Sequence, residues 1–188
     1  LPVDEAVEIM LQALTGLEYA HHAEITAKLA DGTTKTARGL VHRDIKPANF
    51  FLNGSGSSRV AKVGDFGLAK AFDTAGLSGR TATGMVGGTP VFMARQQAMD
   101  FKYAKPDVDV WAMAASLYNM LTGAFVRDFP RGEHPRKIIM RGETVPIRQR
   151  KSSIPRKLAE VIDEALREKP GFKFQSAVEF KRALEGAG

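Results

Sequence analysis

Hydrophobic positions near the start of the chain repeat with the period of an α-helix. Two acidic residues, Asp4 and Glu5, begin this segment, where the positive end of a helix dipole favours them. The segment runs to His22, and its apolar positions are three or four residues apart: Val3, Val7, Met10, Leu14 and Leu17. The pattern predicts a helix with one face against a core.

The next segments alternate between apolar and polar positions, as strands do. The stretch 24–38 alternates in part around Asp31-Gly32, a dipeptide that favours a two-residue turn because both residues tolerate positive φ. We therefore expect an exposed hairpin there. Two more short strands are expected at Asn49–Leu52 and Val60–Val63, joined by GSGS at 54–57. This Gly-Ser-Gly lacks the Lys and the helix of a phosphate-binding loop, which favours a simple turn.

The second half of the chain is dominated by helical patterns. Residues 106–123 are apolar nearly all round, which predicts a buried helix. Asp109 lies inside that helix, and a buried carboxylate needs hydrogen-bond donors. Two more helices are expected at 156–168 and 175–185, whereas 71–88 is rich in Gly, Ser and Thr without periodicity and predicts a loop. The fold is expected to be mainly α, a helical bundle with one or two short β-hairpins.

Composition is that of a soluble globular domain. The chain has 188 residues, 44% hydrophobic and 26% charged, which is enough for one domain with a core. No apolar run approaches 18 residues, so we expect no membrane segment in this chain. The absence of cysteine excludes disulfides and thiolate metal sites and fits a reducing compartment. We expect a cytoplasmic location, with any membrane anchor of a longer protein outside this segment.

The net charge of +6 is concentrated in one segment. From Arg131 to Lys157 there are nine Lys and Arg against two acidic residues, Glu133 and Glu143. Such a surface could attract acidic peptides, nucleic acid or anionic lipid, or it could simply be a solvated face, which is the favoured interpretation. No aromatic residues alternate with the basic ones, so a nucleic-acid partner is not expected.

Polar groups gather inside the apolar stretch LVHRDIKPANF at 40–50. Asp44 can orient or deprotonate a hydroxyl, and Lys46, on the same side of an extended chain, can neutralise a phosphate. Asn49 and Asp65 offer hard oxygen ligands, which suit Mg²⁺. Positioning, a metal and compensating charge are what phosphoryl transfer needs.

Three motifs in order resemble the protein kinase family: HRDIKPAN at 42–49, DFG at 65–67 and GTPVFMARQ at 88–96. Lys46 and Thr89 resemble the serine/threonine branch, and the hairpin at 24–38 resembles insertions in bacterial members. The resemblance implies that residues 1–188 form the large C-terminal lobe of a kinase domain. It also implies ATP and Mg²⁺ as cofactors and proteins with Ser or Thr as substrates.

The resemblance also implies roles for single residues. Asp44 corresponds to the catalytic base and Lys46 to the contact with the γ-phosphate. Asn49 and Asp65 correspond to the Mg²⁺ ligands, and Phe51 would lie beneath the adenine.

Regulation by phosphorylation is implied as well. Arg43, which precedes the catalytic Asp, is typical of kinases controlled through their activation loop. Thr81 and Thr83 resemble the paired threonines of bacterial activation loops, and a phosphate there could be bound by Arg43. Thr89 lies six residues after Thr83 and is counted among these regulatory residues.

The central helix carries a second motif of the family. Asp109 and Trp111 match its DxW, which implies that Asp109 holds the backbone of the catalytic loop and that His42 packs beneath that loop. The family's Ala-Pro-Glu is replaced by Ala94-Arg95-Gln96, and the Arg that normally pairs with its Glu aligns with Lys173. We therefore expect a contact between Gln96 and Lys173 that anchors the segment weakly.

The motifs of the family's small N-terminal lobe do not occur in residues 1–188: no glycine-rich loop, no Val-Ala-Ile-Lys strand and no helix with its Glu partner. We expect the isolated chain to be inactive and to self-associate through the lobe surface left exposed. Two alternatives remain open. One is a pseudokinase-like protein-interaction module that uses the basic face at 131–157 and the apolar surface of the lobe. The other, a helical nucleic-acid-binding domain, rests on charge alone.

Overall fold

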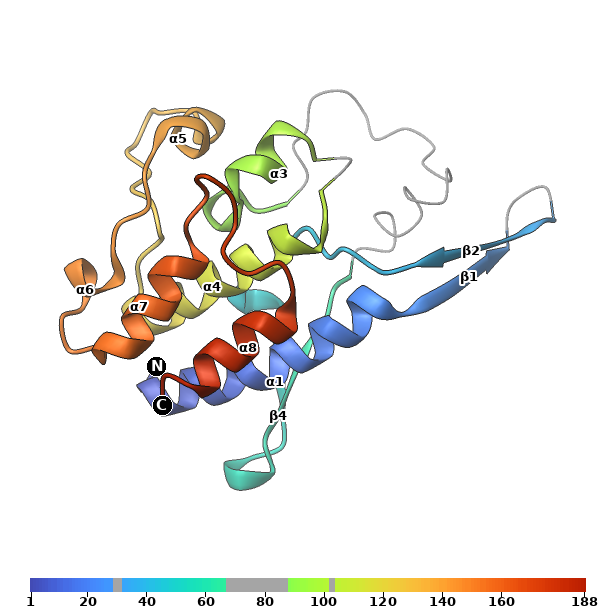
Figure 1. The fold of residues 1–188 in the computed structure, drawn as a ribbon, viewed down its shortest axis with the longest axis horizontal. Helices are drawn as coiled ribbons and strands as arrows, with labels where there is room; N and C mark the ends of the chain where they lie inside the picture. The colour runs from blue at the N-terminus through green and yellow to red at the C-terminus, as the bar shows by residue number, and fades with distance from the viewer. Residues whose placement is uncertain (29–31, 67–87, 102–103) are drawn as a thin grey trace.

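The computed structural model describes residues 1–28, 32–66, 88–101 and 104–188 (Figure 1). Helices, short 3₁₀ turns (η) and strands follow in this order: α1 Val3–His22, β1 Glu24–Lys28, β2 Thr34–Arg38, η1 Pro47–Asn49, β3 Phe50–Asn53, η2 Gly56–Ser58, β4 Val60–Val63, η3 Pro90–Phe92, α3 Arg95–Met99, α4 Pro106–Thr122, α5 Pro135–Arg141, α6 Ile147–Arg150, α7 Arg156–Ala165 and α8 Ala177–Glu185. The fold is mainly helical, as expected.

The core forms around α4, which is buried on every side. All residues from Asp107 to Tyr118 of this helix are buried. α1 packs against it through Met10, Leu14 and Leu17, while α8 lies along α1 and α7 covers another side (Figure 1). α4 ends at Gly123, whose φ of 72° places it in the left-handed region that glycine adopts without strain. A helix that is apolar all round needs such enclosure, because any face left in water would forfeit hydrophobic stabilisation.

Two antiparallel hairpins complete the described part of the fold. The β1–β2 hairpin pairs Glu24 with Arg38 and projects from the end of α1 (Figure 1). The β3–β4 hairpin pairs Phe50 with Val63 and packs on α1, where Oε1 of Gln12 accepts the backbone N–H of Ala61 at 2.7 Å. The polar stretch 42–49 leads directly into β3, and the DFG motif begins two residues after the end of β4.

Both predicted hairpins and the four long helices are confirmed. The predicted loop at 71–88 falls almost entirely on residues 67–87, which lie outside the described part of the chain, as does Asp31 of the predicted turn. The short helices α3, α5 and α6 were not predicted, and α7 ends at Ala165, before the predicted residue 168. None of the helices that the structure describes has the length and apolar character needed to cross a bilayer.

Candidate active site

The backbone of the polar stretch is fixed by a buried carboxylate. Asp109, which is 1% exposed, accepts the backbone N–H groups of His42 at 2.7 Å and of Arg43 at 2.8 Å, one on each oxygen. The Nε2 of His21, at the end of α1, lies 2.9 Å from the same carboxylate. Three donors thus compensate the cost of burying this charge. The expectation that Asp109 holds this loop is confirmed.

Arg43 has an unusual backbone conformation for a residue that is not glycine. Its φ is 64°, a region that costs on the order of 1 kcal/mol or more and persists only where neighbours impose it. The neighbours here are Asp109, on the N–H of Arg43, and Gln97, whose Nε2 donates to the carbonyl of Arg43 at 2.6 Å. The backbone just before Asp44 is therefore held from two helices, α4 and α3.

His42 is fully buried and connects the polar stretch to the DFG segment. Its Nδ1 accepts the backbone N–H of Asp44 at 3.3 Å, so Nε2 carries the proton and donates to the carbonyl of Gly64 at 2.9 Å. The imidazole also packs 4.6 Å from the ring of Phe66, centroid to centroid. The prediction that His42 has a structural role beneath the loop is confirmed.

Three of the predicted site residues meet in a hydrogen-bonded triangle. The side chain of Ile45 is buried in the core. Because side chains alternate along an extended chain, its neighbours Asp44 and Lys46 both lie on the side away from the core. Nζ of Lys46 lies 3.0 Å from Oδ2 of Asp44 and 2.9 Å from Oγ1 of Thr89. The hydroxyl of Thr89 in turn donates to Oδ1 of Asp44 at 2.9 Å. A carboxylate and an ammonium are thereby fixed side by side, with 17% of the Asp44 side chain and 26% of the Lys46 side chain exposed.

Asn49 and Asp65 lie at the same end of the β3–β4 hairpin. Asn49 precedes β3, and its carbonyl accepts the N–H of Gly64, the residue before Asp65, at 3.0 Å. The side chain of Asn49 is buried and its Nδ2 donates to the carbonyl of Asp44 at 2.8 Å, which leaves Oδ1 as an oxygen ligand. Asp65 has φ 57° and an exposed carboxylate. Two hard oxygen donors therefore stand next to the Asp44 triangle.

Phe51 forms an exposed aromatic surface beside these donors. The residue is 56% exposed, and one edge of its ring lies so close to Gly64 that a Cβ there would come within 2.5 Å of Cε2 of Phe51. The lack of a side chain at Gly64 thus leaves room for the ring. Thr81 and Thr83 lie outside the described residues.

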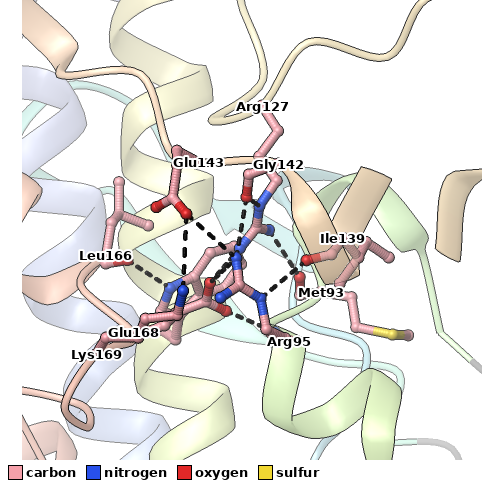
Figure 2. Close-up of polar contacts among 10 residues, drawn as sticks. Met93, Arg95, Arg127, Ile139, Gly142, Glu143, Leu166, Glu168 and Lys169 are labelled. Carbon is pink, nitrogen blue, oxygen red and sulfur yellow. Dashed lines mark hydrogen bonds and ion pairs between the residues drawn. The ribbon is translucent and has the colours of Figure 1, made fainter. Parts of the chain in front are cut away.

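The expected contact between Gln96 and Lys173 is wrong. The Gln96 side chain is exposed at the start of α3, and Nζ of Lys173 lies instead 4.0 Å from Glu164 in a half-exposed ion pair. The buried ion pair of this region joins Arg127 to Glu168 (Figure 2). Sequence reasoning missed it, although an Arg at 127 within the apolar stretch 124–129 was a signal that this side chain needs a buried partner.

Part of the basic segment 131–157 serves the fold. Arg150 pairs with Asp128 at 2.6 Å, and Lys151 donates to the carbonyl of Leu121 at 3.1 Å. Arg148 donates to the carbonyl of Ile154, so three of the basic side chains hold the loops around α6 in place. These contacts favour the interpretation of a solvated, structural face.

Comparison with known proteins identifies the class. Residues 1–173 match the protein kinase domain family, so the chain belongs to the protein kinase family. Relatives include the tyrosine-protein kinase MasK of Myxococcus xanthus, 32% identical over 98% of this chain, and the serine/threonine-protein kinase PknB of Mycobacterium leprae, 30% identical over 98%. A third, named serine/threonine-protein kinases drp72, from Corynebacterium efficiens, is 33% identical over 98%. The resemblance to bacterial serine/threonine kinases seen in the sequence is confirmed.

The matches cover only part of each relative. This chain spans 26% of MasK and of the Mycobacterium leprae PknB and 31% of drp72. Among solved structures, the kinase domain of Mycobacterium tuberculosis PknI is similar to the whole of this chain, with a TM-score of 0.60 and 21% identity over 57% of its own length. The fold is therefore that of a protein kinase.

Proposed function

We propose that residues 1–188 are the large lobe of a serine/threonine protein kinase that transfers the γ-phosphate of ATP to Ser and Thr hydroxyls of protein substrates. The observation that carries this proposal is the triangle of Asp44, Lys46 and Thr89, built on a backbone that Asp109 holds. A carboxylate and an ammonium that are held together by a hydroxyl and stay partly open to solvent fit a site that deprotonates a hydroxyl and binds a phosphate.

The side chains divide the chemistry between them. Asp44 accepts the proton of the attacking hydroxyl and orients it, while Lys46 places a positive charge where the transferred phosphoryl group carries negative charge. Thr89 keeps the two at fixed distance, because its hydroxyl donates to Asp44 and accepts from Lys46. The base and the compensating charge are thus positioned before substrate arrives.

The residues present fit Mg²⁺ and ATP. Oδ1 of Asn49 and the carboxylate of Asp65 would hold Mg²⁺, since the amide nitrogen of Asn49 is already committed to the carbonyl of Asp44. The exposed ring of Phe51 would form the floor beneath the adenine. When bound, Mg²⁺–ATP supplies the phosphoryl group and part of the charge neutralisation.

The preference for Ser and Thr is supported by the contact between Lys46 and Thr89, 2.9 Å apart, and by the names of two of the three relatives. MasK, by contrast, is named a tyrosine kinase. Phosphoamino-acid analysis of a mixed protein substrate, phosphorylated by the longer two-lobe protein with labelled ATP, tests the proposal. Label on Ser or Thr is expected. Label on Tyr alone, or ATP binding without any transfer as in a pseudokinase, would contradict it.

We further propose that the 188-residue chain alone is inactive, works in the cytoplasm within a longer protein and self-associates when isolated. Three apolar side chains of the β3–β4 hairpin are exposed: Phe51 at 56%, Leu52 at 48% and Val60 at 47%. Exposed apolar patches of this kind tend to form contacts with other protein molecules. Sedimentation of the isolated chain should show dimers or larger species that Leu52→Ser with Val60→Ser converts to monomers. A wild-type monomer at all concentrations would refute self-association.

A further inference from the structure

The segment that carries Thr89 ends in a buried ionic anchor formed by Arg127 and Glu168 (Figure 2). We propose that these two side chains are positioning residues of the kinase, which fix residues 89–95 so that Thr89 reaches Asp44 and a peptide substrate finds its binding surface. This inference rests on the proposed function and assigns a role to two residues that the sequence motifs do not include.

The guanidinium of Arg127 is buried, and each of its three nitrogens donates a hydrogen bond. The residue is 1% exposed, and its Nη1 donates to the carbonyl of Met93 at 3.2 Å, while Nε donates to the carbonyl of Gly142 at 3.2 Å. Nη2 donates to Oε2 of Glu168 at 2.5 Å, and the cation lies 4.9 Å from the ring centroid of Trp111. One side chain therefore joins the end of the Thr89 segment to the end of α5, to the segment after α7 and to the central helix.

Glu168 holds the same segment from the other side. Its Oε1 accepts the backbone N–H of Arg95, the first residue of α3, at 2.5 Å, and its Oε2 takes Arg127. The position of Glu168 is itself fixed, because the indole N–H of Trp111 donates to the carbonyl of Leu166 at 3.0 Å. Both a carbonyl and an N–H of the stretch 93–95 are thus bound by the ion pair.

Arg95 adds a second cation beside the same carboxylate. Its Nη2 lies 3.8 Å from Oε2 of Glu168, and its side chain donates to the carbonyls of Ile139 at 3.2 Å and Gly142 at 3.1 Å. In this anchor the carboxylate belongs to Glu168, which follows α7. The cations belong to Arg127, in the loop after α4, and to Arg95, at the start of α3. In the family's pairing the acid stands at the position of Gln96 and the base at the position of Lys173, so acid and base have exchanged sides here.

The anchor is connected to the active site by a short, hydrogen-bonded segment. η3 spans Pro90–Phe92, the N–H of Phe92 donates to the carbonyl of Thr89 at 3.0 Å, and the N–H of Met93 donates to Pro90 at 3.1 Å. A displacement of Met93 or Arg95 therefore shifts Thr89, and with it the hydrogen bonds to Asp44 and Lys46. This mechanical link distinguishes a positioning role from a role in stability alone.

The test uses the longer two-lobe protein with five variants: Arg127→Met, Arg127→Lys, Glu168→Gln, the double variant of Arg127→Met with Glu168→Gln, and Glu164→Gln as a matched control. Glu164 lies in α7, four residues before Glu168, in half-exposed ion pairs with Arg167 and Lys173. Each single variant at the anchor should raise KM for a peptide substrate about tenfold and change KM for ATP less than twofold, because the nucleotide contacts other residues. Arg127→Lys should recover part of the loss.

A second measurement keeps the inference testable without activity. Hydrogen exchange should show lost protection at the amides of 93–98 in both single variants, and the effects should be strongly non-additive in the double variant, since the two side chains act as one unit. Unchanged exchange and unchanged peptide KM in the single variants would overturn the inference. So would a rise in ATP KM equal to that for peptide. If the wild-type protein transfers no phosphate but both single variants lose exchange protection at 93–98, the proposed function is wrong, while the role of Arg127 and Glu168 in fixing this segment is supported.

Discussion

The carboxylate of Asp109 accepts the backbone N–H of Arg43 at 2.8 Å and thereby joins the centre of the buried helix α4 to the residue before Asp44. Because Arg43 has a positive φ, the loop needs this support to keep its conformation. The position of the proposed catalytic carboxylate is therefore set by the core of the lobe.

Asp109→Asn should destabilise the lobe by about 2–3 kcal/mol, because an amide has one acceptor where the carboxylate has two and turns a donor toward a backbone N–H. Urea unfolding of the 188-residue chain measures this. Asp107→Asn is the control two residues earlier: Oδ1 of Asp107 is buried without a hydrogen-bond partner among the residues that the structure describes, so this change should be neutral or stabilising at neutral pH. Equal losses in both variants would contradict the role given to Asp109.

Asp163→Asn should stabilise the lobe at neutral pH. Burial raises the pKa of Asp163, although its Oδ1 accepts the N–H of Ile147 at 2.9 Å. A carboxyl with a raised pKa favours the folded state while it is protonated, and this contribution is lost as pH rises through the folded-state pKa. Asn keeps the acceptor without the charge, so its advantage should be present at pH 7 and vanish in acid below the pKa of the carboxyl.

Melting temperatures across pH measure this difference. Asp163→Ala is the control, since it removes both the charge and the acceptor for Ile147 and should not stabilise. An advantage of Asp163→Asn that persists unchanged at acid pH would show that burial of the charge is not its cause.

Thr89→Val should lower kcat of the two-lobe protein about tenfold or more, equivalent to ~1.4 kcal/mol of lost transition-state stabilisation. The substitution keeps the shape of the side chain and removes the hydroxyl that bridges Asp44 and Lys46. Thr89→Ser retains the hydroxyl and should stay within a few-fold of wild type. Steady-state kinetics with a peptide substrate measures kcat of both variants. Equal kcat values for Thr89→Val and Thr89→Ser would contradict a role of the Thr89 hydroxyl in the active site.

Thr81 and Thr83, rather than Thr74 or Ser78, should carry phosphate in the active, autophosphorylated two-lobe protein. A phosphate adds about −1.5 to −2 charge and would be bound by Arg43 in the catalytic loop. Mass spectrometry locates the modified residues. Phosphate found only at other positions would refute this assignment.

The sequence predicted those elements whose hydrophobic pattern lies within one continuous segment of the chain. Helix α1 follows from apolar periodicity over 20 residues, and α4 follows from a 17-residue stretch that is apolar nearly all round, whereas α5 and α6, with 7 and 4 residues, are too short to show a period. Asp109 was identifiable because a carboxylate inside an apolar helix requires donors.

The anchor was not identifiable in the same way. Arg127 and Glu168 lie 41 residues apart, on two irregular segments, and only packing brings them together. The alignment of Lys173 with the family's Arg directed attention to Gln96, which the structure leaves exposed. A pair that forms across the core leaves no spacing rule in the sequence, so its discovery required the fold.

The central claim is that Asp44 is the catalytic base of a serine/threonine kinase, and the most direct measurement compares Asp44→Asn with wild type in the two-lobe protein. The substitution keeps the size of the side chain and removes its charge and basicity, so kcat for phosphoryl transfer to a Ser/Thr peptide should fall on the order of 10²-fold or more, while ATP affinity changes little. Turnover within a few-fold of wild type, at unchanged ATP affinity, would contradict the account.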